Sequence, residues 1–244
     1  MKNKYELKNL SKMFHENTKK IESIGEYDKR IEYKIYPNSE KIKLIDCKKE
    51  ILKSEFIQNL IYRKSIREWE EKGIKLIDLS NLLNFSFGYR GNNSYGFRTY
   101  ASAGGRYPIE VYVLIENSPD LKKGIYHYNL FENCLELIKE SDFSEEIYKL
   151  YKNQPFELKA SFYLFFTMVF NRTMDKYGER GYRFIYLDAG HMLQNLNLVA
   201  TYLGLGGVEL GASSKSDDYI DKMLGLSSEL ENVFLGVAMG YPKI

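Results

Sequence analysis

The sequence predicts an α+β fold in which helices pack on a mixed sheet, and three observations support this class. KASFYLFFTMVF is a long apolar run, typical of a central strand buried on both faces. RFIYLDAGHMLQNLNLVATYLGL is apolar on nearly every side when drawn as a helix, so we expect a long buried helix. Helical and strand patterns alternate along the chain with one hairpin between them, which is typical of helices covering a mixed sheet.

The N-terminal region is polar and rich in charge, and we expect an arm over residues 1–52 followed by one domain over residues 53–244. Short helical patches are expected in the arm, such as Leu7–Phe14. Pro37-Asn38-Ser39 predicts a turn within it.

Two helices are expected at the start of the domain. SEFIQNLIYRKS has helical spacing of its apolar residues and predicts a short helix that ends near Arg63. KLIDLSNLLNFSF carries N-cap signals at Asp78 and Ser80. The apolar face of this second helix consists of Leu79, Leu82, Leu83 and Phe87.

The remaining elements are mainly strands. IEVYVLIE predicts a strand, and GIYHYN and CLELIK flank a turn at LFEN, which predicts a β-hairpin. DFSEEIYKLYK predicts an exposed helix, and VFLGVAMGY predicts the last strand. Gly204, Gly206 and Gly207 are expected to terminate the long helix.

Composition excludes several classes of protein. The chain of 244 residues has a net charge of +2 with acids and bases interspersed, which argues against a nucleic-acid partner. The longest apolar run, Ala160–Phe170, is shorter than the roughly 20 residues of a membrane-spanning helix. Cys47 and Cys134 lie far apart and the three histidines share no context, so we expect neither a disulfide framework nor a metal site. We expect a reduced, cytoplasmic protein.

Three short blocks have the composition of ligand-binding segments. RKSIR, residues 63–67, offers two guanidinium groups, an amine and a hydroxyl, which suit a phosphate, although alone it favours a solvated basic turn. ASAGGRYP, residues 101–108, has small residues that allow a flat ligand close to the backbone, or it is an ordinary tight loop. LGLGGVELGA, residues 203–212, predicts a glycine-rich turn after the long helix.

The order of these blocks resembles that of the nitroreductase-type flavoproteins. Within that superfamily the chain is similar to the SagB-type dehydrogenases, the FMN enzymes of thiazole/oxazole peptide biosynthesis, from roughly residue 14 onward. The matching blocks are FHENTKK, YRKSIREW, LSNLLNFSFGY, YASAGGRYPIEVYV, GIYHYN, DKYGERGYRF, DAGHMLQNLNLVATYLGLGG and VFLGVAMGYP. The resemblance implies a nitroreductase-like mixed sheet flanked by helices, with FMN at a homodimer interface.

The resemblance also implies which residues contact FMN, and three groups carry over. The first would hold the phosphate and the pyrimidine edge, and it comprises Arg63, Lys64, Ser65 and Arg67. The second would lie along the isoalloxazine, and it comprises Ser102, Gly104 and Gly105. The third would aim a backbone N–H at flavin N5, and it comprises Leu210, Gly211 and Ala212. Many relatives have an acid where Leu210 stands, so only a backbone role carries over there.

An adjacent Lys-Tyr pair before the long helix is regarded as catalytic in SagB-type enzymes, and Lys176 and Tyr177 match it. Oxidation of an azoline ring removes a hydride, which a flavin can accept, and a proton, which needs a base. A lysine acts as that base only where desolvation lowers its pKa from about 10.4. Tyr177 would share the proton or orient the ring.

Geometry adds an expectation for this pair. Successive residues of a helix do not face each other, so the two side chains can meet one substrate more easily from a loop. Gly178 and Gly181 favour a loop here. A chance Lys-Tyr pair on a surface loop is the alternative interpretation.

The other residues with reactive or bulky side chains are expected to have structural roles. Trp69 is expected to anchor the core, and Cys134 is assigned no chemistry. His15 is expected in packing or peptide docking, His127 facing solvent or a neighbouring strand, and His191 packed near a dimer interface. The aromatic residues expected in the core and the interface are Tyr182, Phe184 and Tyr186.

We therefore expect an FMN-dependent dehydrogenase that oxidises thiazoline or oxazoline rings to thiazole or oxazole in a ribosomally made peptide. The expected partners are the precursor peptide, a cyclodehydratase that acts first, and a second copy in a homodimer. The alternatives are an NAD(P)H-dependent nitroreductase or quinone reductase, a non-catalytic flavin-binding scaffold subunit, and a SagB-like enzyme for other peptide dehydrogenations.

Overall fold

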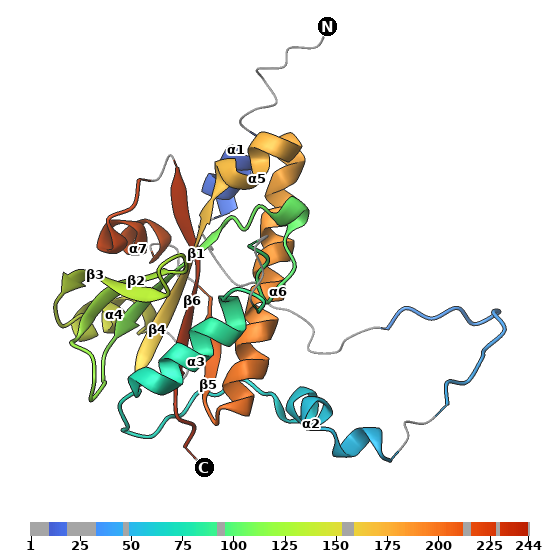
Figure 1. Cartoon of the computed structure of the whole chain (residues 1–244). Coiled ribbons are helices and arrows are strands. Elements are labelled where there is room, and N and C mark those ends of the chain that lie inside the picture. The colour runs from blue at the N-terminus through green and yellow to red at the C-terminus, as the bar shows by residue number, and fades with distance from the viewer. Residues whose placement is uncertain are drawn as a thin grey trace, which may run out of the picture.

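A six-stranded sheet forms the centre of the protein, with helices on both of its faces (Figure 1). The computed structural model describes residues 10–18, 33–45, 49–91, 96–152, 159–211, 216–227 and 230–243. The strands lie in the order β3-β2-β1-β4-β6-β5. Their bounds are β1 Ile109–Ile115, β2 Gly124–Asn129, β3 Cys134–Glu140, β4 Phe162–Val169, β5 Gly206–Leu210 and β6 Glu231–Gly240.

Strand direction differs from the expectation. The α+β class is confirmed, but every strand pairing in the described part of the chain is antiparallel, so the sheet is not mixed. β1 and β2 are joined by a loop that reverses the chain, and β2 and β3 form the predicted hairpin.

The apolar run KASFYLFFTMVF forms β4, which lies between β1 and β6 as a central strand. Its side chains alternate between two cores, as the period of a strand requires. Tyr163 and Phe165 belong to the core on one face. The side chains that belong to the core on the other face are Phe162, Leu164, Phe166 and Met168. The predicted burial of this strand on both faces is confirmed.

Two pairs of helices cover the two faces of the sheet. The apolar faces of α3, Leu76–Phe87, and α6, Gly181–Tyr202, share one core. Those of α4, Ser144–Tyr151, and α7, Ser216–Leu224, share the other core with Trp69. α4 was expected to be exposed, but it buries Ile147, Leu150 and Tyr151 against the sheet.

The long helix α6 is buried along one face only. The expectation of burial on nearly all sides is wrong for the single chain, because Leu187 is 59% exposed and Tyr202 is 64% exposed. The residues of its buried face are Tyr182, Ile185, Asp188, Ala189, Met192, Leu196 and Ala200. An acidic residue, Asp188, therefore stands within an otherwise largely apolar face.

Short helices precede the sheet. α2, Glu55–Tyr62, ends at Arg63 as predicted, after the 3-10 turn Ile51–Lys53. α3 begins after Lys75 and not at the expected caps. Asp120 accepts a hydrogen bond from the backbone N–H of Leu76 at 2.8 Å, and so caps this helix from outside it.

The N-terminal helix α1, Leu10–Thr18, packs against the start of α6. It overlaps the predicted patch Leu7–Phe14, of which residues 7–9 lie outside the described residues. The turn at Pro37-Asn38-Ser39 is confirmed by a hydrogen bond from Ser39 N–H to the Tyr36 carbonyl. The division into an arm and a domain at residue 52 stays a prediction.

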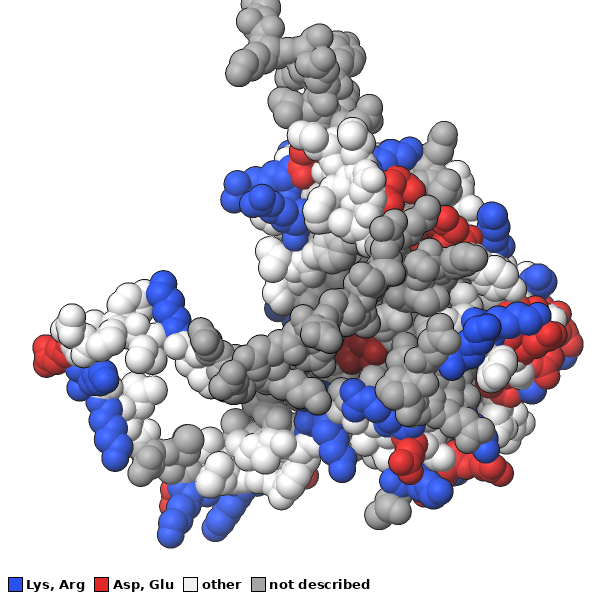
Figure 2. All heavy atoms as spheres, turned by 180° about the vertical axis from the view of Figure 1, so that it is seen from behind, with Lys and Arg blue, Asp and Glu red and all other residues white. Residues whose placement is uncertain are grey.

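Two properties of the described residues bear on partners. None of the described helices is long and apolar enough to cross a membrane. On the face seen in Figure 2, Lys and Arg side chains lie among Asp and Glu side chains.

Candidate functional site

Lys176 and Tyr177 are the last two residues of α5, Phe170–Tyr177. The expectation of a loop is therefore wrong, because the chain leaves β4 directly into this short helix. Gly178 ends it with a φ of 59°, a backbone conformation that favours glycine. The 3-10 turn η4, Gly178–Arg180, then leads directly into α6.

The two side chains nevertheless reach the same place, which is Gly104 in the loop before β1. A β-carbon added at Gly104 would lie 2.6 Å from Nζ of Lys176 and still closer to Oη of Tyr177. Real β-carbons essentially never approach other atoms within 3.0 Å, so only glycine leaves room for both groups here. Nζ of Lys176 lies 5.3 Å from the centre of the Tyr177 ring. The structure thus joins two of the predicted blocks.

Gly104 belongs to a segment, residues 101–107, that we call the glycine loop. Its middle forms the 3-10 turn η3, Ala103–Gly105, with positive φ at both glycines. Tyr107 also has a positive φ, of 45°, which is unfavourable for a residue with a side chain. The loop therefore needs contacts from outside to hold its shape.

Residues of α6 supply many of these contacts. Asp188 accepts hydrogen bonds from Ser102 Oγ at 2.5 Å and from Ala103 N at 3.1 Å. Ser102 Oγ in turn accepts a hydrogen bond from the backbone N–H of Tyr107 at 2.8 Å. Ser102 is one of the residues that the resemblance places along the isoalloxazine, and its hydroxyl is thus engaged within the protein. One turn further along α6, Nδ1 of His191 donates to the Ala101 carbonyl at 3.0 Å.

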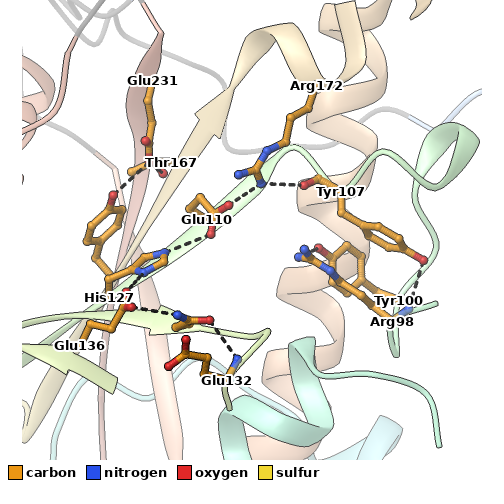
Figure 3. Close-up of polar contacts among 12 residues, drawn as sticks. Arg98, Tyr100, Tyr107, Glu110, His127, Glu132, Glu136, Thr167, Arg172 and Glu231 are labelled. Carbon is orange, nitrogen blue, oxygen red and sulfur yellow. Dashed lines mark hydrogen bonds and ion pairs between the residues drawn. The ribbon is translucent and has the colours of Figure 1, made fainter. Parts of the chain in front are cut away.

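A second network holds the loop from the side of α5 (Figure 3). The guanidinium of Arg172 lies between the Tyr107 carbonyl, at 3.2 Å, and Glu110 on β1. Glu110 also contacts Nε2 of His127 at 3.1 Å, and Nδ1 of His127 contacts Glu136 on β3 at 2.8 Å. Arg172 precedes Lys176 by one helical turn, so this network fixes the helix that carries the candidate catalytic pair.

Electrostatics within this network favour charged groups. Burial opposes ionisation of Glu110, but the hydrogen bond from His127 and the Arg172 guanidinium outweigh it and lower the pKa of this carboxyl. The hydrogen bond to Glu110 raises the pKa of His127 above its ordinary value, and Glu136 adds to this effect. In the first network, burial raises the pKa of Asp188, although the bonds from Ser102 and Ala103 oppose the shift.

The RKSIR block lies elsewhere, after α2. Arg63 and Ser65 are half-buried, whereas Lys64 and Arg67 are exposed. The backbone N–H of Ile66 donates to the Gly207 carbonyl at 2.9 Å, which ties the block to β5. Nε1 of Trp69 donates to the Gly206 carbonyl at 3.0 Å, and its 5% exposure confirms it as a core anchor.

The segment expected as a glycine-rich turn contains a strand. Gly204 follows the end of α6 with a φ of 69°, but Gly206 and Gly207 begin β5. A β-carbon at Gly206 would clash with the Ile66 side chain, so this glycine allows close packing and does not end the helix. Leu210 ends β5 and is buried, Gly211 follows it and is exposed, and Ala212 lies outside the described residues.

The predicted site residues therefore form two groups in one chain. RKSIR contacts β5 just after the C-terminal end of α6, whereas Lys176 and Tyr177 come just before its N-terminal end (Figure 1). A helix of 22 residues spans about 33 Å, so the two groups lie near opposite ends of a long element.

The residues fit FMN in two respects. The glycine loop is open at Gly105, where an added β-carbon would meet nothing within 4 Å, so a flat ring can approach this backbone. RKSIR offers exposed cationic groups beside a backbone hydrogen-bonded to β5, as a phosphate requires. Among the described residues, no group of His, Cys, Asp and Glu side chains could hold a metal ion.

Sequence reasoning missed the residues that hold the glycine loop. Asp188, Arg172 and Glu110 were not singled out, because their partners lie far away in the sequence. For Asp188 one signal existed, since an acid stood on the apolar face of a predicted helix. His127 was expected to face either solvent or a neighbouring strand. It contacts Glu110 on β1 and Glu136 on β3, which confirms the second of these expectations.

The remaining residues with assigned roles divide between core and surface. His15 is buried and contacts the Tyr182 hydroxyl at 3.2 Å, which agrees with packing. Tyr182 is buried as expected. Tyr186 is 43% exposed, so it does not belong to the core of the single chain.

A comparison with models of known protein families identifies the family of this chain. The model of the nitroreductase family matches residues 60–241, and the chain belongs to that family. Protein MJ1384 of Methanocaldococcus jannaschii, named as a nitroreductase, is 33% identical over 176 residues, which are 72% of this chain and 82% of that protein.

A second relative has a more specific name. The microcin B17-processing protein McbC of Escherichia coli is 32% identical over 135 residues, 53% of this chain. The matched region covers 48% of McbC, so the chain spans about half the length of that relative. These matches confirm the resemblance recognised in the sequence.

Solved structures agree on the fold. A chain of the E. coli microcin synthetase McbBCD complex, solved with truncated pro-MccB17 bound, superposes with a TM-score of 0.80 at 20% identity, covering 99% of this chain and 95% of that one. A nitroreductase of Desulfovibrio desulfuricans, solved in complex with FMN, has a TM-score of 0.56 at 16% identity and covers 79% of this chain and 88% of that one.

Proposed function

We propose that this protein is an FMN-dependent dehydrogenase that oxidises azoline rings to azoles in a ribosomally made peptide. The observation that carries the proposal is the convergence of the Lys176 amine and the Tyr177 hydroxyl on Gly104. An amine and a hydroxyl so close to a loop whose backbone is open to a flat ring support a role as an acid–base pair. Similarity to McbC, a microcin B17-processing protein, supports a peptide as the substrate.

The reaction removes two hydrogens from neighbouring ring atoms. FMN, when bound, supplies the acceptor for the hydride. Lys176 takes the proton from the adjacent ring atom, and the Tyr177 hydroxyl orients the ring or shares that proton. The ring leaves with one more double bond, and oxygen is the proposed final acceptor of the electrons.

A second copy of the chain would complete the site. Lys176 is exposed in one chain, and a neutral lysine base needs desolvation that the described residues of one chain do not supply. The phosphate-binding block and the Lys-Tyr pair also lie near opposite ends of α6. A homodimer in which the block of one copy approaches the glycine loop of the other would bring both groups to one FMN.

Exposed apolar side chains support this arrangement. A soluble chain rarely leaves many large apolar groups open unless a partner covers them. The relevant side chains on α2 and α6, each at least 42% exposed, are Phe56, Leu60, Ile61, Tyr62, Tyr186, Leu187 and Tyr202. We place these residues in the dimer interface. Ala212 is proposed to contribute with Leu210 and Gly211 through the backbone, next to the flavin ring.

A cyclodehydratase would supply the substrate, because an azoline must be formed before it can be oxidised. Likeness to a chain of the McbBCD complex, solved with truncated pro-MccB17 bound, supports a complex with other subunits and a peptide. We propose that this protein acts in such an assembly.

The proposal is tested with purified full-length protein. Its absorbance spectrum should show bound FMN, and a peptide carrying thiazoline or oxazoline rings should lose two hydrogens per ring by mass spectrometry. A matched incubation with NADPH and a nitroaromatic or quinone serves as the control. Rapid flavin reduction by NADPH without loss of hydrogen from the peptide would contradict the proposal and favour the reductase alternative, which the match to MJ1384 represents.

A further inference from the structure

Polar side chains on one side of α6 hydrogen-bond to the backbone before and within the glycine loop. Of these, Asp188 is buried, Asn195 is half-buried and His191 is exposed. Asp188, His191 and Asn195 lie three and four residues apart, so they share one side of the helix. Asn195 donates to the Thr99 carbonyl at 3.1 Å, and His191 donates to the Ala101 carbonyl at 3.0 Å. Asp188 accepts from Ser102 and Ala103. We call these three residues the α6 polar ladder.

Of these three residues, Asp188 bonds to the part of the loop next to Gly104, the glycine beside Lys176 and Tyr177. It is 2% exposed, and each of its two carboxylate oxygens receives one hydrogen bond from the loop. Ala103 directly precedes Gly104, the first residue with a positive φ in the loop. The hydrogen bond from the Ala103 N–H to Asp188 therefore fixes the peptide plane between Ser102 and Ala103, just before this turn.

The same carboxylate acts on the far end of the loop through Ser102. Because Ser102 Oγ donates to Asp188, its lone pairs point toward the Tyr107 N–H, from which it accepts. Tyr107 needs this support, since its positive φ is unfavourable for a residue with a side chain. One buried carboxylate therefore holds both ends of a loop whose backbone conformation at Tyr107 is unfavourable without such contacts.

We propose that Asp188 is a positioning residue, which holds Gly104 against the Lys176 amine and the Tyr177 hydroxyl through the Ser102–Tyr107 hydrogen bonds. It does not contact the substrate itself. The inference deepens the proposed azoline oxidation and rests on it for its effect on catalysis, while its effect on the loop is independent of that reaction.

Asp188→Ala removes both acceptors, and Asp188→Asn keeps the acceptor for Ala103 but loses the one for the Ser102 hydroxyl. Amide hydrogen exchange is measured on the full chain before flavin is added, and turnover is measured afterwards at saturating FMN. We expect exchange at residues 102–107 to rise by about 10- to 100-fold in Asp188→Ala and less in Asp188→Asn, the range of a hydrogen bond to a charged group. We expect kcat to fall in the same order, with flavin content unchanged.

Asp221 offers a matched control on the opposite face of the sheet. It is also a buried helical carboxylate, 4% exposed, and it accepts from the Val233 N–H at 2.7 Å and from Asn232 Nδ2 at 2.9 Å. Asp221→Ala should raise exchange near the start of β6 and leave kcat per flavin-loaded molecule unchanged.

A purely structural role of Asp188 would give a different pattern. Asp188→Ala would then raise exchange across β4 as well as in the loop, or would change kcat by no more than about threefold, like Asp221→Ala and ordinary surface substitutions. Either result would overturn the inference. In the double variant, the effects of Ser102→Ala and Asp188→Ala on amide exchange should not add, because both act through one set of hydrogen bonds. Full additivity would show that Asp188 does not act through Ser102. A wild-type protein without azoline oxidation would refute the proposed function instead, and exchange would still decide whether Asp188 fixes the loop.

Discussion

Gly104→Ala should impair catalysis while leaving the fold intact, and the size of the effect follows from the contacts at this position. The new β-carbon would lie 2.6 Å from Nζ of Lys176, and ordinary contacts begin at 3.4 Å, so Nζ must move by about 0.8 Å. Oη of Tyr177 must move further. Both atoms are the ends of flexible side chains, which can turn away without unfolding the protein. A misplacement of about 1 Å can cost 100-fold in rate.

The substitution also strains the backbone, because Gly104 has a φ of 62°. This conformation costs a residue with a β-carbon about 1–2 kcal/mol. Gly225→Ala is a matched control: Gly225 has a φ of 74°, and a β-carbon there would meet nothing within 4 Å. The two variants should therefore lose similar free energy of unfolding.

Azoline oxidation at saturating FMN separates the two effects, together with thermal unfolding and flavin absorbance of each variant. We expect Gly104→Ala to lose about 100-fold in kcat, and Gly225→Ala to keep the wild-type value. The reasoning is refuted if Gly104→Ala turns over within about threefold of Gly225→Ala, the range of ordinary surface substitutions.

Three further predictions concern the surroundings of the site. The pKa of His127 is raised in the folded protein, so its protonated form stabilises the fold. The difference in free energy of unfolding between wild type and His127→Gln should therefore be largest below pH of about 6.5 and shrink as the pH rises through the higher folded pKa. A difference that grew with pH in denaturant titrations would contradict this sign. Ser11→Ala removes a hydroxyl that donates to the Glu179 carboxylate, so the protein should lose about 1 kcal/mol and α1 should exchange its amides faster, whereas unchanged exchange in α1 would show that this bond does not hold the helix. Trp69→Phe deletes the hydrogen bond to Gly206 and should cost about 1–3 kcal/mol in urea unfolding, and a cost near zero would mean that water replaces this donor.

Local patterns were sufficient for most of the fold. The continuous apolar run KASFYLFFTMVF predicted a central strand buried on both faces, and β4 is one because each face of the sheet is covered by two helices. The β-hairpin and the end of α2 were also predicted, since turn residues and apolar spacing decide them within a few residues.

Errors arose where long-range contacts decide the structure. Gly206 and Gly207 indicated a turn, but they allow β5 to lie against Ile66 and β6, which are distant in sequence. α6 looked buried on nearly all sides because apolar side chains, Tyr186, Leu187 and Tyr202, also lie outside its buried face, although one chain leaves them exposed.

The candidate site shows the same limit. The sequence pointed to Lys176, Tyr177 and the glycine loop separately, but only the folded chain shows that both side chains meet Gly104. Asp188 lies 85 or more residues from its partners in the loop, so no local pattern could connect them. The two side chains meet without the expected loop, because Tyr177 is the last residue of α5. From this helix end the Tyr177 side chain reaches the same glycine as that of Lys176.

The central claim is that Lys176 serves as the base in flavin-dependent oxidation of an azoline. Its most direct test is azole formation by Lys176→Ala, measured by mass spectrometry on an azoline peptide, beside the flavin absorbance of the same sample. The account predicts a variant that retains FMN and forms no azole. A variant that still forms azole at the wild-type rate, or that is inactive because it no longer binds FMN, would contradict it.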